Sequence, residues 1–482
     1  MSLRKRAISG AAWSAAGGWG RQLVNFIVFA LLARILGAEA FGLIASASVF
    51  IAFLQVFLDQ GFSTALIQRQ NIDAEHLDTA FWINLLMGVL LTAICWSTAA
   101  PFSNFYHLPA LSPILQILSL SFLINSLSRV QSAILDRNLR FRAQALRSII
   151  SVSVGGVVGV TLALLGYHVW SLVGQQISTE ICGVLVLWSA SDWRPKFRVS
   201  KKHFLELFSY GAHIFGISIL NFFNRRSDDF LIGYYLGPTA LGYYSIAYRL
   251  LLTVTNLLIN VVNRVALPVF SKIQDQQEKM TDAFYKSIKL SGLATTPVFV
   301  GMCILAPDII GFVFGPQWQE SVLVMRVLSC IGLVHSLTYF CSTIMLSMGK
   351  SEWRLKVSLL NSVFNLVSFL IVVKWGILAV AIAYTARGYL FLPINLMLTK
   401  KLIDIDIVCL AKQYSSALIA SSFTFLLIIS FRYLILEFTP LNLQTYVLTY
   451  CFIGLATYAL CIKWLEKKII REFFGSFEKA SG

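Results

Sequence analysis

Long apolar stretches separated by short polar turns run through the whole chain. Each stretch is close to or above the roughly 20 residues that a helix needs to cross the ~30 Å hydrocarbon core of a bilayer. Transmembrane strands would instead alternate over about 10 residues. The pattern predicts an all-α polytopic membrane protein with about fourteen transmembrane helices, at 11–36, 40–66, 79–104, 110–135, 145–166, 168–189, 205–236, 239–270, 284–315, 319–348, 355–374, 376–399, 407–431 and 441–463.

Composition supports this class. The 482 residues are 57% hydrophobic and only 13% charged, whereas soluble proteins have about 25% charged residues. A soluble enzyme, a disordered chain and a fibrous protein are therefore excluded. The net charge of +16 alone would suit a nucleic-acid binder, but this apolar fraction would not, so no nucleic-acid partner is expected.

The basic residues predict the orientation. Most of the 39 Lys and Arg residues lie in the termini and the even-numbered turns, as in 191–203, whereas the opposite turns carry only Arg34, Lys374 and Arg432. By the positive-inside rule, both termini are cytoplasmic. Met1–Arg6 and the apolar run after it resemble a signal peptide. The length of that run and Arg21 within it favour an uncleaved first helix.

Nothing in the sequence indicates a metal site or a cofactor. The six histidines have no metal-ligand spacing, and no CxxC is present. The eight cysteines are dispersed in apolar segments and are expected to be buried free thiols: Cys95, Cys182, Cys303, Cys330, Cys341, Cys409, Cys451 and Cys461.

An internal repeat divides the chain. Leu36-Gly37-x-x-x-Phe41-Gly42 recurs as Leu236-Gly237-x-x-x-Leu241-Gly242, an offset of 200, and a Ser/Leu pattern at 118–134 recurs at 328–344. Six helices per copy give parallel repeats about an axis along the membrane normal. We expect two six-helix lobes around a central cleft: an N-lobe at 1–189, a cytoplasmic linker at 190–203, a C-lobe at 204–399, and two further helices with a cytoplasmic tail at 400–482.

Charges at membrane depth are the candidate functional groups, because each costs at least ~2.5–3.5 kcal/mol to insert. Basic groups outnumber acidic ones, which suits an anionic ligand such as the diphosphate of a lipid. The candidate substrate-binding residues are Arg21, Asn25, Asn221, Arg225, Arg226, Arg249, Arg326 and Arg387.

Two spacings connect these candidates. Arg225 and Arg249 each lie twelve residues from Gly237, so in an antiparallel helix pair both are about 18 Å from the turn. At the offset of 200, Arg21-x-x-x-Asn25 overlays Asn221-x-x-x-Arg225. Both lobes are therefore expected to point an Arg and an Asn at the cleft.

The deeper acids are candidates for ion coupling: Asp59, Glu180, Asp228 and Asp229. Each also has a simpler interpretation, because a carboxylate can merely neutralise a nearby arginine. On a helix, Arg226 faces Asp229, and Arg225 faces Asp228 and Asp229.

Three further segments carry a family resemblance. They are 57–69 at the end of the second helix, 268–274 at the end of the eighth, and 312–318 before the tenth. With the turn at 36–42, their order and spacing resemble the polysaccharide-transport branch of the multidrug/oligosaccharidyl-lipid/polysaccharide exporter superfamily, and within it Wzx-type flippases of the colanic-acid exporter kind.

That resemblance implies a bacterial inner-membrane flippase that moves undecaprenyl-diphosphate-linked oligosaccharide units from the cytoplasmic to the periplasmic leaflet by alternating access. It implies a monomer in contact with membrane lipids and with a polysaccharide polymerase and export machinery, and no catalytic residues. Two alternatives stay open: an ion-coupled multidrug exporter of the same superfamily, and a membrane polysaccharide polymerase or ligase.

Overall fold

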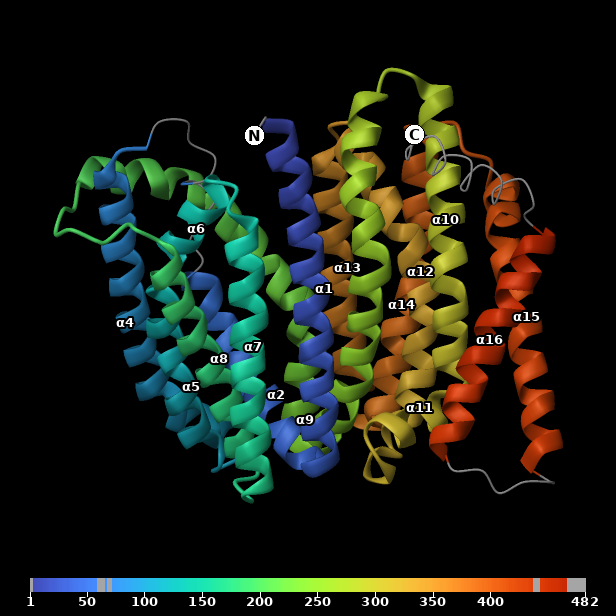
Figure 1. The fold of residues 1–482 in the computed structure, drawn as a ribbon, viewed down its shortest axis with the longest axis horizontal. Coiled ribbons are helices and arrows are strands. Elements are labelled where there is room, and N and C mark those ends of the chain that lie inside the picture. The colour runs from blue at the N-terminus through green and yellow to red at the C-terminus, as the bar shows by residue number, and fades with distance from the viewer. Residues whose placement is uncertain (1–2, 59–65, 67–71, 437–442, 466–482) are drawn as a thin grey trace. The chain divides into compact units, whose positions relative to one another are not determined.

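A computed structural model describes residues 3–58, 66, 72–436 and 443–465 (Figure 1). Over these residues the chain is helical and forms no strand, which confirms the expected all-α class. Ten of the described helices are long and apolar enough to cross a membrane. The chain is a multi-pass membrane protein, while the total of fourteen spans stays a prediction.

The chain divides into two compact units, Met1–Ser245 and Ile246–Gly482. The expected lobe boundaries at 189 and 203 and the expected cleft remain predictions. Unit 1 contains the helices α1 (Leu3–Ile35), α2 (Ala38–Leu58), α4 (Ala74–Phe105), α5 (Leu111–Ser126), α6 (Arg129–Arg137), α7 (Phe141–Leu164), α8 (Val169–Ala190) and the beginning of α9 (Lys201–Lys272).

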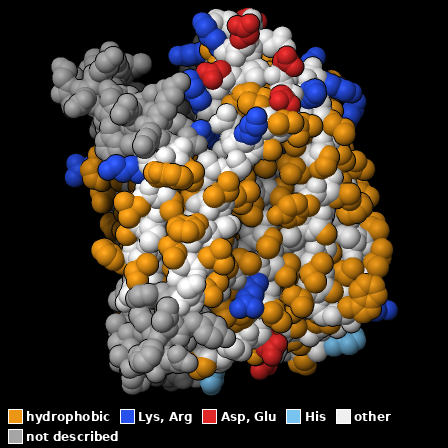
Figure 2. Space-filling view, turned by 90° about the vertical axis from the view of Figure 1, so that its right-hand side faces the viewer, with side chains coloured by type: hydrophobic (Ala, Val, Ile, Leu, Met, Phe, Trp, Pro, Cys, Tyr) orange, Lys and Arg blue, Asp and Glu red, His pale blue; other side chains and the backbone are white. Residues whose placement is uncertain are grey.

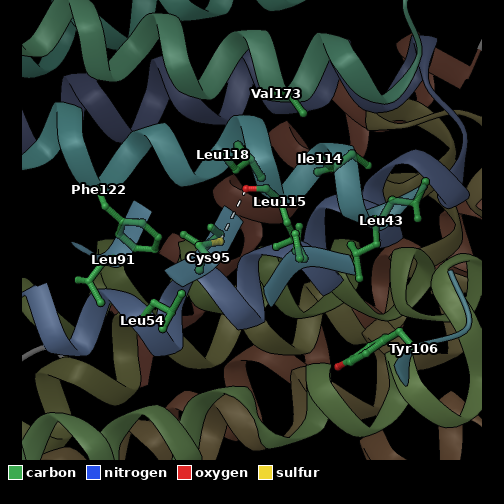
Figure 3. Packing of buried hydrophobic residues seen from close by; sticks show 14 of the residues in the cluster. Leu43, Leu54, Leu91, Cys95, Tyr106, Ile114, Leu115, Leu118, Phe122 and Val173 are labelled. Atoms are coloured by element: carbon green, nitrogen blue, oxygen red, sulfur yellow. Dashed lines mark hydrogen bonds between the residues drawn. The ribbon is translucent and has the colours of Figure 1, made fainter. Parts of the chain in front are cut away.

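The core of unit 1 lies between α2, α4, α5 and α8. Figure 3 shows Leu91, Cys95 and Leu115 directed into one interior, and Cys95, Leu115 and Phe122 are fully buried there. The Cys95 thiol donates to the carbonyl of Leu115 at 3.7 Å. Because the hydrophobic residues of this cluster pack around Cys95 and Leu115, this contact is structural.

Small residues bring α7 close to α1 and α8. A side chain at Gly155 would overlap Thr179 of α8, and one at Gly17 would overlap Ala145 of α7. Close backbone approach of this kind is how membrane helices associate where there is no hydrophobic driving force between them.

The two copies of the repeated glycine motif contact each other. A Cβ atom at Gly42 in α2 would overlap the carbonyl oxygen of Pro238 in α9, and a Cβ at Gly242 would overlap the carbonyl oxygen of Ala38. At an offset of 200, Pro238 corresponds to Ala38 and Gly242 to Gly42. The contact is therefore reciprocal, as an approximate two-fold relation produces.

Helix α9 covers both the seventh and the eighth predicted span. The only non-helical backbone within it is at Gly237, with φ 83° and ψ 177°. Because this φ lies in a region that favours glycine, Gly237 forms the predicted turn without any added loop.

The stretch before α9 is held against α4. The Lys196 amide donates to Asp78 Oδ1 at 3.1 Å, and its carbonyl accepts from Trp82 Nε1 at 2.9 Å. Phe197 stacks on the Trp82 ring at 4.3 Å, and the Ser200 amide donates to Thr79 Oγ1 at 3.1 Å. The predicted linker is thus bonded to α4 at residues 196–200, and α9 begins within it, at Lys201.

Unit 2 contains the rest of α9 and the helices α10 (Gln277–Ile304), α11 (Ala306–Val313), α12 (Ser321–Ser347), α13 (Ser351–Val372), α14 (Ile377–Lys400), α15 (Ile407–Leu436) and α16 (Leu443–Leu465). Its core includes Phe284, Phe340 and Ile344, all fully buried. Two short 3₁₀ helices, Pro316–Trp318 and Val373–Trp375, lie at helix ends.

Two predicted spans are interrupted. The stretch 110–135 divides into α5 and α6 at Leu127–Ser128, and 284–315 divides into α10 and α11 at Leu305. Pro307 explains the second break, because proline fits the first turn of a new helix and not a helix interior. Hydropathy alone does not reveal such breaks, because the sequence is apolar both before and after each break.

The outer face of unit 2 suits a lipid environment. Figure 2 shows hydrophobic side chains over the middle of the face on the α15–α16 side, with most of the charged side chains at its upper end and a few lower down. Exposed apolar residues of α15 and α16 include Ile419, Leu426, Phe452 and Leu455. A broad apolar surface with charged residues gathered toward its ends is the arrangement that a bilayer favours.

Candidate functional site

The acidic pair of α9 is buried and bound within unit 1. Asp228 is 2% exposed and Asp229 4%. Asp229 Oδ2 forms a salt bridge with Arg226 Nη1 at 2.9 Å, as the helical spacing predicted. Asp228 Oδ2 accepts a hydrogen bond from the Tyr244 hydroxyl at 2.9 Å. Sequence reasoning missed Tyr244, because its partner lies sixteen residues away across the Gly237 turn.

Aromatic side chains lie beside this pair at the end of α4. The Tyr106 hydroxyl donates to the carbonyl of Phe230 at 3.1 Å. Phe105 stacks on Tyr234 at 4.7 Å. Burial, and then the charge of Asp229, raise the pKa of Tyr106, so this phenol stays protonated and acts as a hydrogen-bond donor. Aromatic residues thus enclose the acidic pair on this side.

A basic cluster in unit 1 joins α1, α6 and α7. Arg147 interacts electrostatically with Arg21, Arg129 and Asp136. Gln144 connects it to the acid, because its Oε1 accepts from Arg147 at 3.4 Å and its Nε2 donates to Asp136 Oδ1 at 3.2 Å. The sequence did not indicate this link, because Asp136 lies on α6 and Gln144 and Arg147 lie on α7, so that the packing of the two helices brings them together.

Arg21 itself is exposed on α1, and Asn25, one turn further on, is half-buried. The i,i+4 spacing keeps both side chains on one side of the helix. An exposed arginine backed by other basic groups is available to an anion. Its assignment to substrate binding remains a prediction.

Glu180 of α8, like Asp78 of α4, has one buried carboxylate oxygen without a hydrogen-bond partner. Its Oε1 accepts from Gln176 Nε2 at 3.3 Å. Its Oε2 is buried without a hydrogen-bond partner, although Ser121 and Asn125 of α5 lie close. These neighbours are uncharged, and the assignment of Glu180 to ion coupling stays a prediction.

Arg387 of α14 is the most deeply buried of the candidate arginines described, at 7% exposed. Its guanidinium carbon lies 4.5 Å from the centre of the Tyr384 ring. Its Nε is enclosed without a hydrogen-bond partner. A cation–π contact contributes only about 0.5–2 kcal/mol, which does not replace the hydration that a buried cation loses.

The other candidates are more exposed or fall outside the description. Arg225, Arg249 and Arg326 are exposed, and Arg326 acts electrostatically on Cys303. The side chain of Asn221 and all of Asp59 lie outside the described residues. Arg225 belongs to unit 1 and Arg249 to unit 2, so their shared cavity stays a prediction.

The chain belongs to a family of multi-pass membrane proteins. Residues 31–323 match the family described as polysaccharide biosynthesis protein, and the chain is a member of it. It is 28% identical over 355 residues to the teichuronic acid biosynthesis protein TuaB of Bacillus subtilis, which covers 73% of each chain. It is 27% identical over 406 residues to the lipopolysaccharide biosynthesis protein WzxC of Escherichia coli, covering 83% of this chain and 81% of that one.

A solved structure has the same fold. The lipid II flippase MurJ in an inward closed conformation matches with a TM-score of 0.77, over 96% of this chain and all of that chain, at 17% identity. At that identity the likeness shows the fold alone.

Proposed function

We propose that the protein is a flippase that moves lipid diphosphate-linked oligosaccharides from the cytoplasmic to the periplasmic leaflet of a bacterial inner membrane, for the synthesis of surface polysaccharide. It acts as a transporter by alternating access, without catalytic residues or a cofactor. The family and the names of its relatives support polysaccharide biosynthesis, and the fold shared with a lipid II flippase supports a lipid-linked substrate.

The observation that carries this proposal is the buried guanidinium of Arg387, in a span whose other charged residue is Lys400 at its last position. It lies ten residues from the start of α14 (Ile377–Lys400), about 15 Å along a helix axis, and is therefore near the middle of the span. A cation at that depth is costly and marks a substrate or ion pathway. A diphosphate accepts several hydrogen bonds from guanidinium groups, which suits this position.

Other parts of the proposal rest on the sequence. Arg21, Asn25, Asn221, Arg225, Arg226, Arg249 and Arg326 are further candidates for the head group. Asp59, Glu180, Asp228 and Asp229 are the candidates for ion coupling. The termini are cytoplasmic, and the protein works as a monomer that delivers its product to a polymerase and export machinery.

The test is export of surface polysaccharide in a strain that lacks its own flippase. The wild-type chain should restore export, and Arg387→Gln should reduce it at least tenfold at equal membrane abundance, whereas Arg198→Gln in the exposed linker should not. Restored drug resistance without restored polysaccharide would favour a multidrug exporter. Polymer formation by the purified protein would favour a polymerase. Either result would overturn the proposal.

A further inference from the structure

A second enclosed polar group lies beside Arg387 in unit 2. His335 of α12 has its Nδ1 buried without a hydrogen-bond partner. Arg387 is the charged group that acts on its ring. Both side chains contact Tyr384: the guanidinium lies over its face, and the imidazole ring is 6.5 Å away at 87°. Two side chains that can carry a positive charge, each with a nitrogen that lacks a hydrogen-bond partner, thus lie beside one aromatic ring.

Helix geometry explains why these groups meet. Tyr384 and Arg387 are three residues apart on α14, and His335 and Tyr339 are four apart on α12, so each pair shares a helix face. The His335 and Tyr339 rings lie 6.0 Å apart. Thr385 donates to the carbonyl of Val327 at 3.1 Å, which ties α14 to α12.

Aromatic rings surround the other sides. Tyr248 meets Tyr384 edge-on at 5.7 Å, and Phe369 stacks on it at 6.4 Å. Such walls keep water out and strengthen any charge interaction inside. Packed protein interiors leave few polar groups unpaired, and each exception calls for an explanation. A bound anion would give both Arg387 Nε and His335 Nδ1 a hydrogen-bond partner.

Among the described residues, Arg387 is the charged group that acts on the His335 ring, and no acid acts on it, although α10, α11 and α13 carry Asp282, Asp308 and Glu352 elsewhere along their length. The other charged and titratable groups near this part of unit 2 are Tyr384 from α14, Tyr339 and Arg326 from α12, Arg354 from α13 beside Tyr339, Tyr248 from α9, Tyr414 from α15 beside Ser336, and Cys303 from α10 beside Cys330. A second positive charge at His335 is therefore unfavourable while the site is empty, because no carboxylate offsets it.

We propose that Arg387 and His335 form one binding site for a phosphate-bearing anion, and that His335 takes up a proton when the anion binds. The neutral imidazole presents one donor and one acceptor, whereas the imidazolium donates from both nitrogens. The negative charge of the phosphate offsets the repulsion by Arg387 and stabilises the imidazolium. Anion binding and uptake of one proton from solvent are thereby linked.

The inference deepens the proposed function, on which it rests for the identity of the anion as a lipid diphosphate. The site itself requires only phosphate oxygens, which a lipid head group or a free phosphate can supply. Its consequence is that release of the head group also releases a proton.

The experiment is calorimetric titration of the purified full chain in nanodiscs. The two probes are farnesyl diphosphate and inorganic pyrophosphate. Titrations in two buffers of different ionisation enthalpy give the number of protons taken up per anion bound. In wild type, the affinity should fall with rising pH, by up to about tenfold per pH unit for one linked proton.

His335→Gln should still bind, with about one proton less taken up per anion and a shallower pH dependence. His168→Asn is the control, because His168 is exposed and asparagine tolerates its φ of 43°. This control should match wild type. Arg387→Lys keeps a positive charge and should weaken binding of the diphosphate at least tenfold.

Tighter binding of the lipid would identify the head group as the ligand, and equal binding would identify the phosphates alone. Equal proton uptake by wild type and His335→Gln would overturn the proposal even if transport survives. Undiminished affinity in Arg387→Lys would show that the anion binds elsewhere. The complementation assay of polysaccharide export tests the proposed flippase function separately. The anion site and the flippase function can therefore be contradicted independently.

Discussion

Gly42 and Gly242 make the same contact in opposite directions. Gly42 faces the backbone carbonyl of Pro238, which directly follows the Gly237 turn of α9, and Gly242 faces that of Ala38, the first residue of α2. The two motifs that were noticed as a repeat in the sequence are therefore neighbours in unit 1. Because the contact is made by backbone, neither position has room for a side chain.

Gly42→Ala and Gly242→Ala should each destabilise the protein by about 1–3 kcal/mol, since the added methyl group forces two backbones apart. Thermal unfolding in detergent measures the loss. Gly18→Ala is the matched control, because nothing lies within 4 Å of a Cβ at Gly18, and alanine there should stabilise by up to about 1 kcal/mol. Unchanged melting of both contact variants would show that the helices do not approach so closely.

The Arg226–Asp229 pair should respond asymmetrically to mutation. Arg226→Gln leaves the buried Asp229 carboxylate without its cation, which costs up to about 3 kcal/mol after allowing for the 40% exposure of the Arg226 side chain. The double variant Arg226→Gln, Asp229→Asn should recover part of this loss, because no uncompensated charge remains.

The control for this pair is Lys286→Gln. It removes a salt bridge to Asp282 in which both side chains are about two-thirds exposed, at 66% and 64%. Stability should hardly change there. If the double variant melts below Arg226→Gln, the pair is not held together by charge.

Cys303 and Cys330 should form a disulfide under mild oxidation. Their thiols are in hydrogen-bonding contact between α10 and α12, and one turn away Phe299 lies against Gly332. Diamide can accept the two electrons and two protons that the thiols release. Peptide mass spectrometry should then find the Cys303–Cys330 link in wild type and no link in Cys330→Ser. A product joining other cysteines instead would contradict this pairing.

Arg21→Ala and Arg225→Ala should lose polysaccharide export while membrane abundance is kept. Both side chains are exposed, so their removal leaves no buried charge behind and should affect the ligand more than the fold. Export by the complemented strain, normalised to protein level, is the measurement, and Arg198→Ala is the control. Full export by both variants would remove these arginines from the binding site.

The sequence predicted the fold well because bilayer thickness imposes the length of each span. It predicted the turn at Gly237 and the Arg226–Asp229 pair, since both depend on local spacing. The break at Leu305 was missed because an apolar helix can restart in place. The partner of Asp228 and the link from Arg147 through Gln144 to Asp136 were missed because they depend on which helices pack together, and spacing along the chain does not encode this.

In the candidate site, too, the sequence indicated local features and did not indicate contacts between helices. Eight residues were chosen for charge or polarity at membrane depth, and the structure separates an enclosed Arg387 from exposed Arg225 and Arg326. His335 was not among them, because a lone histidine has no signal in sequence. Its importance comes only from its position beside Arg387 and Tyr384.

The attachment of residues 196–200 to α4 limits how the chain can move. A freely solvated connection would be a flexible linker and would leave the position of the following helix unrestrained. Here three hydrogen bonds and the stacked Trp82–Phe197 pair fix the chain immediately before α9 begins. Residues 196–200 are therefore a rigid connection between α4 and α9. A large displacement at the start of α9 would have to carry α4 with it or break these bonds.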